Sequence, residues 1–484
     1  MNVRIGKSVK GVFAAIGLSL SISTFAGAER TGIPVVKFEG PINGGSRGYP
    51  YSASIVDLKP YGYTESEYFI AGTAHTFKPA PGTTLSTDGR WQVVADEESP
   101  FKTRILVRRP APEKFNGTVI VEFMQEYFGS ERDTNFRWNA ETLLRQGFAW
   151  VGVSLHHEGI DDPAPMQTQT YGNITFTKGL TLARWDSERY GALSLPSSDL
   201  SYDILSQLAR SVGPNRPRGD IDPLDGLKVK KVIAAGNTIA GHRLAIYINA
   251  VQPLTHAFDG FYLQDLTPHK LQLAKDVPTP TAQPLRTDVD VPVMVFNTTT
   301  AAMAGQQAEG QDIRFWEPAG SSHTTGPATT RIAQANARDM GQEGGFCPPE
   351  YANTFPVHYV SGAAIVALDR WVKTGAKPPV FPQLKVVQDG KEAVTPFDEY
   401  GNSLGGLRTP WVDVPVARYD WRGECPGGAG RTYPFTTEQL RKLYKSPADY
   451  QAKFRKAVDS AVRQHVLLPE DAKEAVAKAA QVNW

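Results

Sequence analysis

Short apolar runs alternate with helical patterns through the middle of the chain, and this alternation constrains the fold more than any other feature. The runs expected to be buried strands are Thr118–Phe123, Ala149–Ser154, Lys231–Gly236, Pro292–Phe296 and Ile313–Trp316. Helical spacing is found in Asn139–Gln146, in Leu200–Val212 and in a segment that opens at Gly241. Because parallel strands need long crossover connections, usually helices, this order predicts an α/β fold with a mostly parallel sheet and helices on both faces.

The regions on either side of this alternation differ from it in pattern. Turn-forming residues separate strand-like segments such as Tyr68–Gly72 and Arg104–Val107 before the first buried run, and helical patterns occupy Val360–Lys373 and residues 437–480 after the last one. Residues 156–200 show little periodicity, which is typical of a lid or a binding loop. The expected parts are a signal peptide at 1–28, a β-rich extension at 29–116 packed on the main domain, the α/β domain at 117–435 with its insertion at 156–200, and a C-terminal helical segment at 436–484.

The N-terminus has the pattern of a cleavable signal peptide. Basic residues between Arg4 and Lys10 precede an apolar, uncharged segment, Gly11–Phe25, and small residues follow at Ala26–Ala28. An uncleaved membrane anchor is the alternative, but the apolar segment is shorter than a bilayer-spanning helix requires. We therefore expect cleavage before Glu29 and a periplasmic or secreted protein with no membrane span after cleavage.

The charge balance and the cysteine content exclude some classes of partner and of metal site. Lys and Arg total 51 and Asp and Glu total 50, so a net charge of +1 provides no field to attract nucleic acid. Cys347 and Cys425 would form a disulfide in an oxidising compartment, whereas a metal site would need further ligands around them, and the sequence shows none. The segment His156–Glu158 also lacks metal-ligand spacing. We expect no metal, no cofactor and no nucleic-acid partner.

A strand, a glycine-rich turn and a helix surround Thr238. The strand Lys231–Gly236 leads into Gly236–Gly241, and small residues in such a turn let strand and helix approach closely. In enzymes with an α/β-hydrolase fold a G-x-S-x-G turn in this context exposes the nucleophilic serine. Thr238 stands at the serine position, although β-branched residues tolerate the positive φ of that turn poorly. Either Thr238 attacks a carbonyl, or the turn is structural and does no chemistry.

A literal G-x-S-x-G motif also occurs at Gly401–Gly405. Acidic, turn-rich sequence precedes it, and no strand or helix pattern flanks it. Without the strand-turn-helix context, the motif does not predict a nucleophile at Ser403.

His323 is the candidate general base, because it follows the last strand of the expected sheet. In this fold the chain order is nucleophile, acid, histidine. The acid is expected after the strand Pro292–Phe296, but the loop there contains no carboxylate. Glu309 and Asp312 lie further along and could orient His323 only if the loop folds back. Backbone N–H groups of Ile239, after Thr238, and of Gln125, after the strand Thr118–Phe123, are the expected oxyanion-hole donors.

The chain resembles a family of exported bacterial proteins with an α/β-hydrolase domain, over nearly all of the mature sequence. The segments that carry the resemblance are Gly117–Glu122, Trp150–Ser154, Trp185–Gly191, Ser201–Ile204, Asn249–Val251, Phe258–Phe261, Gly405–Pro410 and Trp316–His323. The resemblance implies an α/β-hydrolase fold, carboxylic-ester hydrolysis and a catalytic role for His323. It places the family's elbow serine (G-E-S-Q-S) on Thr238 and a second serine on Ala240. The family's T-E-T-D loop falls on Thr298–Ala301, where both carboxylates are missing.

Two functions follow from these observations. In the first, the protein is an ester hydrolase in which Thr238 attacks, His323 is the base and a displaced carboxylate orients it. In the second, it is a degenerate hydrolase that keeps the fold and binds a small molecule or a partner. A carboxylate within hydrogen-bonding reach of His323 would favour the first.

Overall fold

The computed structural model describes residues 32–127, 129–171, 174–217, 219–267, 271–281, 283–342, 351–423 and 428–484. The predicted signal peptide at 1–28 and both cysteines of the predicted disulfide, Cys347 and Cys425, lie outside these ranges. Within them, no helix combines the length and the apolar character needed to cross a bilayer.

A nine-stranded sheet forms the centre of the molecule, in the order β1-β2-β3-β7-β4-β10-β11-β12-β13. Strands β7 to β13 in this order pair in parallel, whereas β1, β2 and β3 join one edge in antiparallel pairing. Their bounds are β1 (Lys37–Glu39), β2 (Tyr63–Pro79), β3 (Val93–Pro110), β4 (Thr118–Phe123), β7 (Ala149–Val153), β10 (Lys231–Asn237), β11 (Gly260–Gln264), β12 (Val293–Phe296) and β13 (Ile313–Trp316). The predicted, mostly parallel sheet is confirmed.

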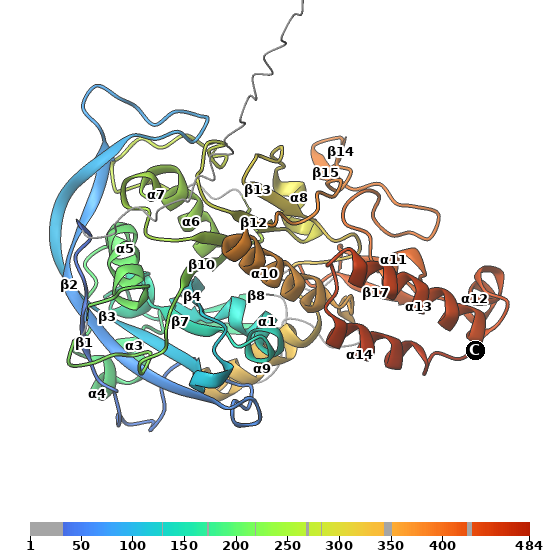
Figure 1. Ribbon diagram of the computed structural model, residues 1–484, viewed down its shortest axis with the longest axis horizontal. Coiled ribbons are helices and arrows are strands. Elements are labelled where there is room, and N and C mark those ends of the chain that lie inside the picture. The colour runs from blue at the N-terminus through green and yellow to red at the C-terminus, as the bar shows by residue number, and fades with distance from the viewer. Residues whose placement is uncertain are drawn as a thin grey trace, which may run out of the picture.

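Helices cover both faces of this sheet, as predicted (Figure 1). The helices are α1 (Thr134–Arg145), α2 (His157–Ile160), α3 (Leu182–Trp185), α4 (Ser187–Tyr190), α5 (Ser201–Val212), α6 (Ile239–Ala250), α7 (Gln252–Thr255), α8 (Thr299–Ala304), α9 (Gly326–Met340), α10 (Val357–Thr374), α11 (Pro410–Asp413), α12 (Thr437–Leu443), α13 (Pro447–Arg463) and α14 (Pro469–Ala479). Short 3-10 turns occur at Lys59–Tyr61, Pro112–Lys114 and Ser198–Leu200.

The alternation of side chains along the strands divides the core into two layers. In β10, Val232 and Ala234 pack in the layer that includes α5 and α6, and Ile233 and Ala235 pack in the layer that includes α1 and α10. Successive side chains of a strand point to opposite faces, so a strand with helices on both sides must be apolar throughout. This is why the central strands read as continuous apolar runs in the sequence.

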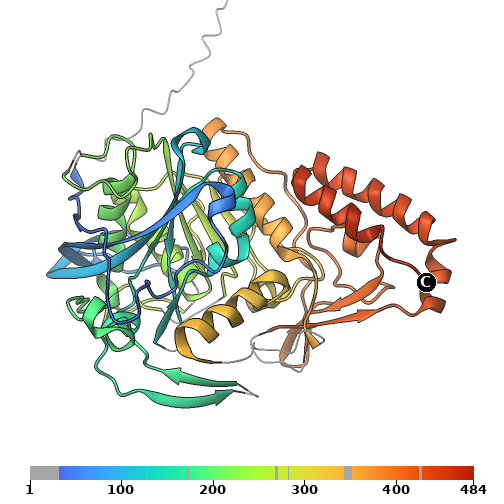
Figure 2. The same cartoon turned by 90° about the horizontal axis from the view of Figure 1, so that it is seen from below.

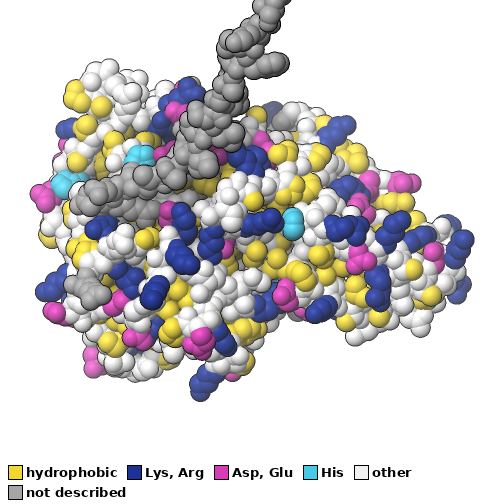
Figure 3. All heavy atoms as spheres, in the orientation of Figure 1, with side chains coloured by type: hydrophobic (Ala, Val, Ile, Leu, Met, Phe, Trp, Pro, Cys, Tyr) yellow, Lys and Arg dark blue, Asp and Glu magenta, His cyan; other side chains and the backbone are white. Residues whose placement is uncertain are grey.

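The segments before and after the central strands take different positions. The long strands β2 and β3 extend the main sheet itself, so the N-terminal region shares its core. Helices α12, α13 and α14 lie together at one end of the molecule, away from the sheet (Figures 1 and 2). Basic and acidic side chains are interspersed over the face shown in Figure 3, in keeping with the net charge of +1.

Further short strands pair with each other outside the main sheet, in the segments that connect its elements or follow it. They are β5 (Gln125–Tyr127) with β6 (Ser130–Arg132), β8 (Gln167–Tyr171) with β9 (Ile174–Lys178), β14 (Val387–Asp389) with β15 (Glu392–Val394), and β16 (Ala417–Asp420) with β17 (Arg431–Pro434). The insertion at 156–200 thus contains the β8–β9 hairpin and short helices, and β5–β6 follows directly after the central strand β4.

Candidate active site

The turn between β10 and α6 holds Thr238 in a strained conformation. Its φ is 50° and its ψ is −111°, outside the regions that β-branched residues favour. A Cβ on Gly236 would lie 2.8 Å from the backbone of Ala240, so only glycine permits the close approach of strand and helix here. The Thr238 N–H donates to the carbonyl of Gln264 at 2.9 Å, which ties the turn to the end of β11. The predicted sharp turn is therefore present, with threonine at its tip.

The hydroxyl of Thr238 is half-buried and engaged by its neighbour. Thr238 Oγ1 donates to Oδ1 of Asn237 at 2.7 Å. Ile239, the next residue, is the first of α6, and the first N–H groups of a helix have no acceptor within the helix. An oxygen near the Thr238 hydroxyl would therefore meet a backbone donor and the positive end of a helix dipole.

His323 lies on the loop after β13 and pairs with a buried carboxylate. Its Nδ1 is 2.8 Å from Oδ2 of Asp265, whose side chain is fully buried, whereas the histidine side chain is 27% exposed. When Nδ1 carries a proton and donates it to Asp265, Nε2 is left as an acceptor. This is the arrangement that a general base needs, because the carboxylate fixes both the tautomer and the orientation of the ring.

Further donors hold Asp265 in place. Oδ1 of Asp265 accepts from the backbone N–H and from Oγ1 of Thr298, each at 2.7 Å. The N–H of Asp265 donates to the carbonyl of Phe296 at 2.9 Å. The carboxylate is thus satisfied on both oxygens, and one of them is directed at His323.

The prediction that Glu309 or Asp312 orients the histidine is corrected by this geometry. Glu309 accepts a hydrogen bond from the N–H of Phe315 at 3.2 Å, and Asp312 pairs with Lys377 at 3.1 Å. Both carboxylates therefore have partners other than His323. The acid that contacts His323 comes from the end of β11, one strand earlier than expected.

The sequence did contain a signal for Asp265. It directly follows Gly260–Gln264, a short run with apolar residues at its centre that was not assigned as a strand. Because β11 and β12 are adjacent and parallel, their carboxyl ends meet at the same edge of the sheet. The T-E-T-D loop of the resembled family maps to Thr298–Ala301, and Thr298 now binds the acid supplied by the neighbouring strand.

The pKa of His323 reflects two opposing influences. Burial of the ring lowers its pKa, but the charge of Asp265 and the hydrogen bond to it raise the pKa by more, so the net shift is upward. The residue can therefore hold a proton that it has accepted, which suits a base that must later return that proton to a leaving group.

A cavity of about 120 Å³ adjoins His323. Its lining residues come from the β5–β6 hairpin, from α1 and its start, from the elbow and from the loop and helix after β13. They are Gln125, Tyr127, Arg132, Thr134, Trp138, Asn237, His323, Thr324 and Ile332. Gln125 lies at the cavity wall, where its Oε1 accepts from Oγ1 of Thr134 at 2.9 Å. The oxyanion-hole roles of Ile239 and Gln125 stay predictions, supported by these positions.

Two other histidines follow β7, and the Nε2 of one of them, His156, is buried without a hydrogen-bond partner among the described residues. His156 is buried against the ring of Phe123, and burial lowers its pKa to about 3. His157 Nδ1 lies 2.8 Å from the carbonyl of Leu195. Across the described ranges, no group of three or more His, Cys, Asp or Glu side chains is placed to hold a metal ion.

Comparisons with known proteins agree with this description. A family model described as "Alpha/beta hydrolase domain" matches residues 38–477. A search of curated proteins finds no match.

Solved structures that resemble the chain include three hydrolases, all at low identity. Thermogutta terrifontis esterase 2 phosphorylated by paraoxon is 12% identical, with a TM-score of 0.26, and the match covers 44% of this chain and 77% of that one. XC6422 from Xanthomonas campestris, a member of a/b serine hydrolase without lid, is 10% identical with a TM-score of 0.24 and coverage of 63% and 93%. An alpha-beta serine hydrolase homologue from Coxiella burnetii is 8% identical with a TM-score of 0.26 and coverage of 50% and 92%.

Proposed function

Because this chain belongs to the alpha/beta hydrolase domain family, whose model spans residues 38–477, we propose that it is a carboxylic-ester hydrolase with a threonine nucleophile. The observation that carries the proposal is the 2.8 Å contact between His323 Nδ1 and the buried carboxylate of Asp265. A carboxylate within reach of His323 is the feature that we expected to favour the hydrolase, and Asp265 supports the proposal in that position.

The proposed reaction begins at Thr238. His323 Nε2 takes the proton of the Thr238 hydroxyl while Oγ1 attacks the ester carbonyl carbon, and Asp265 stabilises the imidazolium that forms. The N–H groups of Ile239 and Gln125 bind the oxyanion of the tetrahedral intermediate. The intermediate collapses by breaking the bond to the alkoxy group, which takes its proton from His323 and leaves an acyl-threonine. Water, activated by the same histidine, then releases the acid.

One contact must change for this reaction to start. The Thr238 hydroxyl donates to Asn237 Oδ1 at 2.7 Å, so it must turn from this acceptor towards His323. A rotation about χ1 of Thr238 costs little compared with the barrier to ester hydrolysis, because staggered rotamers of threonine are close in energy. The same hydrogen bond is the observation that favours the second candidate function, a binding protein whose elbow no longer reacts.

The test is hydrolysis of short-chain aryl esters by the purified protein and by single variants. We expect turnover by the native protein, retained turnover in Thr238→Ser, and a loss of at least about a thousandfold in kcat/KM in Thr238→Ala and in His323→Ala. The matched control is His75→Ala, because His75 also pairs with an aspartate, Asp203, at 3.1 Å but outside the lining of this cavity.

The alternative outcomes are distinct. Activity that appears only in Thr238→Ser would show a hydrolase scaffold whose nucleophile no longer functions, and the binding role would replace the proposal. Activity that survives in Thr238→Ala would also overturn it, because another group would then be the nucleophile.

A further inference from the structure

Arg132 differs from the other buried arginines around the β5–β6 hairpin. It is 7% exposed and lines the cavity beside His323. Its Nε has no hydrogen-bond partner, and no carboxylate forms an ion pair with its guanidinium within the part of the chain that the structure describes. A buried guanidinium that lacks a carboxylate partner costs free energy, so this arrangement needs a reason.

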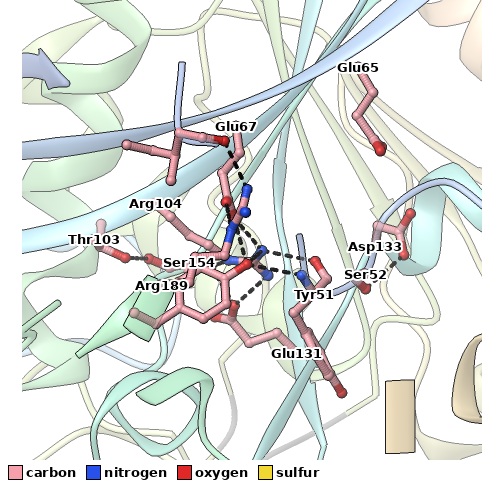
Figure 4. Close-up of polar contacts among 12 residues, drawn as sticks. Tyr51, Ser52, Glu65, Glu67, Thr103, Arg104, Glu131, Asp133, Ser154 and Arg189 are labelled. Atoms are coloured by element: carbon pink, nitrogen blue, oxygen red, sulfur yellow. Dashed lines mark hydrogen bonds and ion pairs between the residues drawn. The ribbon is translucent and has the colours of Figure 1, made fainter. Parts of the chain in front are cut away.

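The neighbouring arginines show what a structural role looks like (Figure 4). Arg104 is fully buried and lies 2.8 Å from Glu67 and 3.4 Å from Glu131. Arg189 lies 2.6 Å from the other oxygen of Glu67. Each of these two guanidinium groups, drawn as sticks in Figure 4, meets at least one carboxylate. Arg132 lies one residue from Glu131 but takes no part in this network.

The β5–β6 hairpin explains the separation. Gln125 pairs with Arg132 and Glu126 pairs with Glu131, and opposite residues of an antiparallel pair lie on the same face. Side chains alternate between faces along each strand, so Glu131 meets Arg104 while Arg132, Gln125 and Tyr127 face the cavity. The hairpin thus presents one positive charge to the site.

The groups around Arg132 act on its charge without forming an ion pair with it in the part of the chain that the structure describes. Its guanidinium lies 5.2 Å from the ring centre of Tyr127. Burial and the charge of Arg137 lower the pKa of Arg132, and the opposing effects of Tyr51, Tyr127 and Glu126 do not outweigh them. Glu126 acts on Arg132 through its charge but forms no ion pair with it. It accepts a hydrogen bond from the N–H of Gly129, and burial raises the pKa of Glu126 to about 7. Among the described residues that line the cavity, none is an aspartate or a glutamate.

We propose that Arg132 forms a carboxylate-binding subsite, and that the esters hydrolysed at this site carry a carboxylate on a short acyl group. This inference rests on the proposed function. A guanidinium presents a planar fork of N–H donors that fits both oxygens of a carboxylate. Arg132 and His323 line the same cavity of about 120 Å³, so the carboxylate and the ester carbonyl must be only a few bonds apart. Monoesters of short dicarboxylic acids have this spacing.

A matched pair of substrates tests the subsite. Monomethyl succinate carries the carboxylate, and methyl succinamate replaces it with a neutral amide of nearly the same shape. We expect the native protein to favour the anionic ester in kcat/KM, and we expect Arg132→Gln to lower the ratio of the two kcat/KM values about a hundredfold. Arg132→Lys keeps the charge but not the planar fork of donors, so its ratio should lie between those of the native protein and of Arg132→Gln. Arg109→Gln is the control, because Arg109 lies in β3 and pairs with Asp225 outside the cavity; it should leave the ratio unchanged.

Binding of free succinate separates this inference from the proposed function. Succinate should raise the Tm of the native protein and of Arg109→Gln, but not that of Arg132→Gln, and succinamide should raise none of them. Succinate binding that depends on Arg132, in a protein that hydrolyses no ester, would overturn the proposed function and leave the subsite standing. Hydrolysis of both esters at equal kcat/KM, with no Tm shift from succinate, would overturn the subsite and leave the hydrolase standing. If Arg132→Gln does not fold, the substrate ratio and the Tm shift of the native protein decide between these outcomes.

Discussion

Glu131 and Arg132 are neighbours in β6, yet their side chains lie in regions with different electrostatics. On the Glu131 side, Arg104, Arg189 and Glu67 form a buried network in which each charge meets an opposite charge (Figure 4). On the Arg132 side, the cavity contains an arginine that forms no ion pair with a carboxylate of the described residues, although the charge of Glu126 acts on it. Both regions are buried, so the difference lies in pairing and not in exposure.

Buried charges that pair with each other stabilise the fold, whereas a buried charge without an ion pair can bind a ligand of opposite charge. A buried network whose members satisfy one another adds rigidity and needs nothing from outside. A buried charge without a partner makes the ligand-free protein less stable and is tolerated where binding supplies the missing partner. His323 falls between these cases, because Asp265 satisfies Nδ1 while Nε2 stays available for chemistry.

The largest effect is expected for the contact between Asp265 and His323, because it gives a buried carboxylate a partner, as in the network around Arg104, and also orients the proposed base. Asp265→Asn replaces the carboxylate with a group of similar shape but no charge, and we expect kcat to fall by about 10³ to 10⁴ because the histidine loses its tautomer and its counter-charge. Asp203→Asn removes the partner of His75 and is the matched control, with an unchanged rate. A loss below about tenfold in Asp265→Asn would mean that the pair is structural, like the network around Arg104.

The pH profile of the same variant sharpens this prediction. The base works only when neutral, and Asp265 raises the pKa of His323, so kcat/KM of the native protein should increase with pH through a value above 6.5. Without Asp265 only the effect of burial is left, which lowers the pKa of the ring. The acidic limb of the residual activity of Asp265→Asn should therefore move below pH 6.5. A limb that stays in place would assign it to another group.

The second largest effect is expected in the buried network of Arg104, Glu67 and Glu131, and it concerns the free energy of unfolding. Arg104→Met would leave Glu67 and Glu131 buried without their shared partner, and such a loss costs about 3–5 kcal/mol in the free energy of unfolding. Urea denaturation followed by tryptophan fluorescence measures it. Arg109→Met is the control on the same strand, where the ion pair to the exposed Asp225 should contribute at most about 1 kcal/mol.

The sequence predicted the parts of this molecule that depend on local pattern. Continuous apolar runs located most of the parallel strands, and small residues around Gly236 and Gly241 located the turn at Thr238. The strand Gly260–Gln264 was missed because its apolar run is only three residues long, Phe261–Leu263, and with it the acid Asp265 was missed. His323 and Asp265 are separated by 58 positions, so only the pairing of strands in the sheet decides which carboxylate reaches the histidine.

The same reasoning explains why Arg132 carried no signal. The strands β5 and β6 are three residues each, too short to show periodicity. Whether a charged residue joins a network or lines a cavity depends on the register of this hairpin, and a shift by one residue would exchange Glu131 and Arg132. Composition and spacing hold no information on that register.

The smallest expected effect has the opposite sign to that of Arg104→Met. Arg132→Met removes a buried charge that forms no ion pair with a described carboxylate, and it keeps most of the apolar stem. We therefore expect the free energy of unfolding without ligand to stay level or rise by about 1 kcal/mol. Urea denaturation at pH 7, under the conditions used for Arg104→Met, measures the difference. A loss of more than about 1 kcal/mol would show that the contact with Tyr127 stabilises the hairpin, and Arg132 would then belong with the structural arginines. A gain in stability together with a loss of selectivity for anionic esters would show that the unpaired charge serves binding at the expense of stability, because one substitution would then move the two properties in opposite directions.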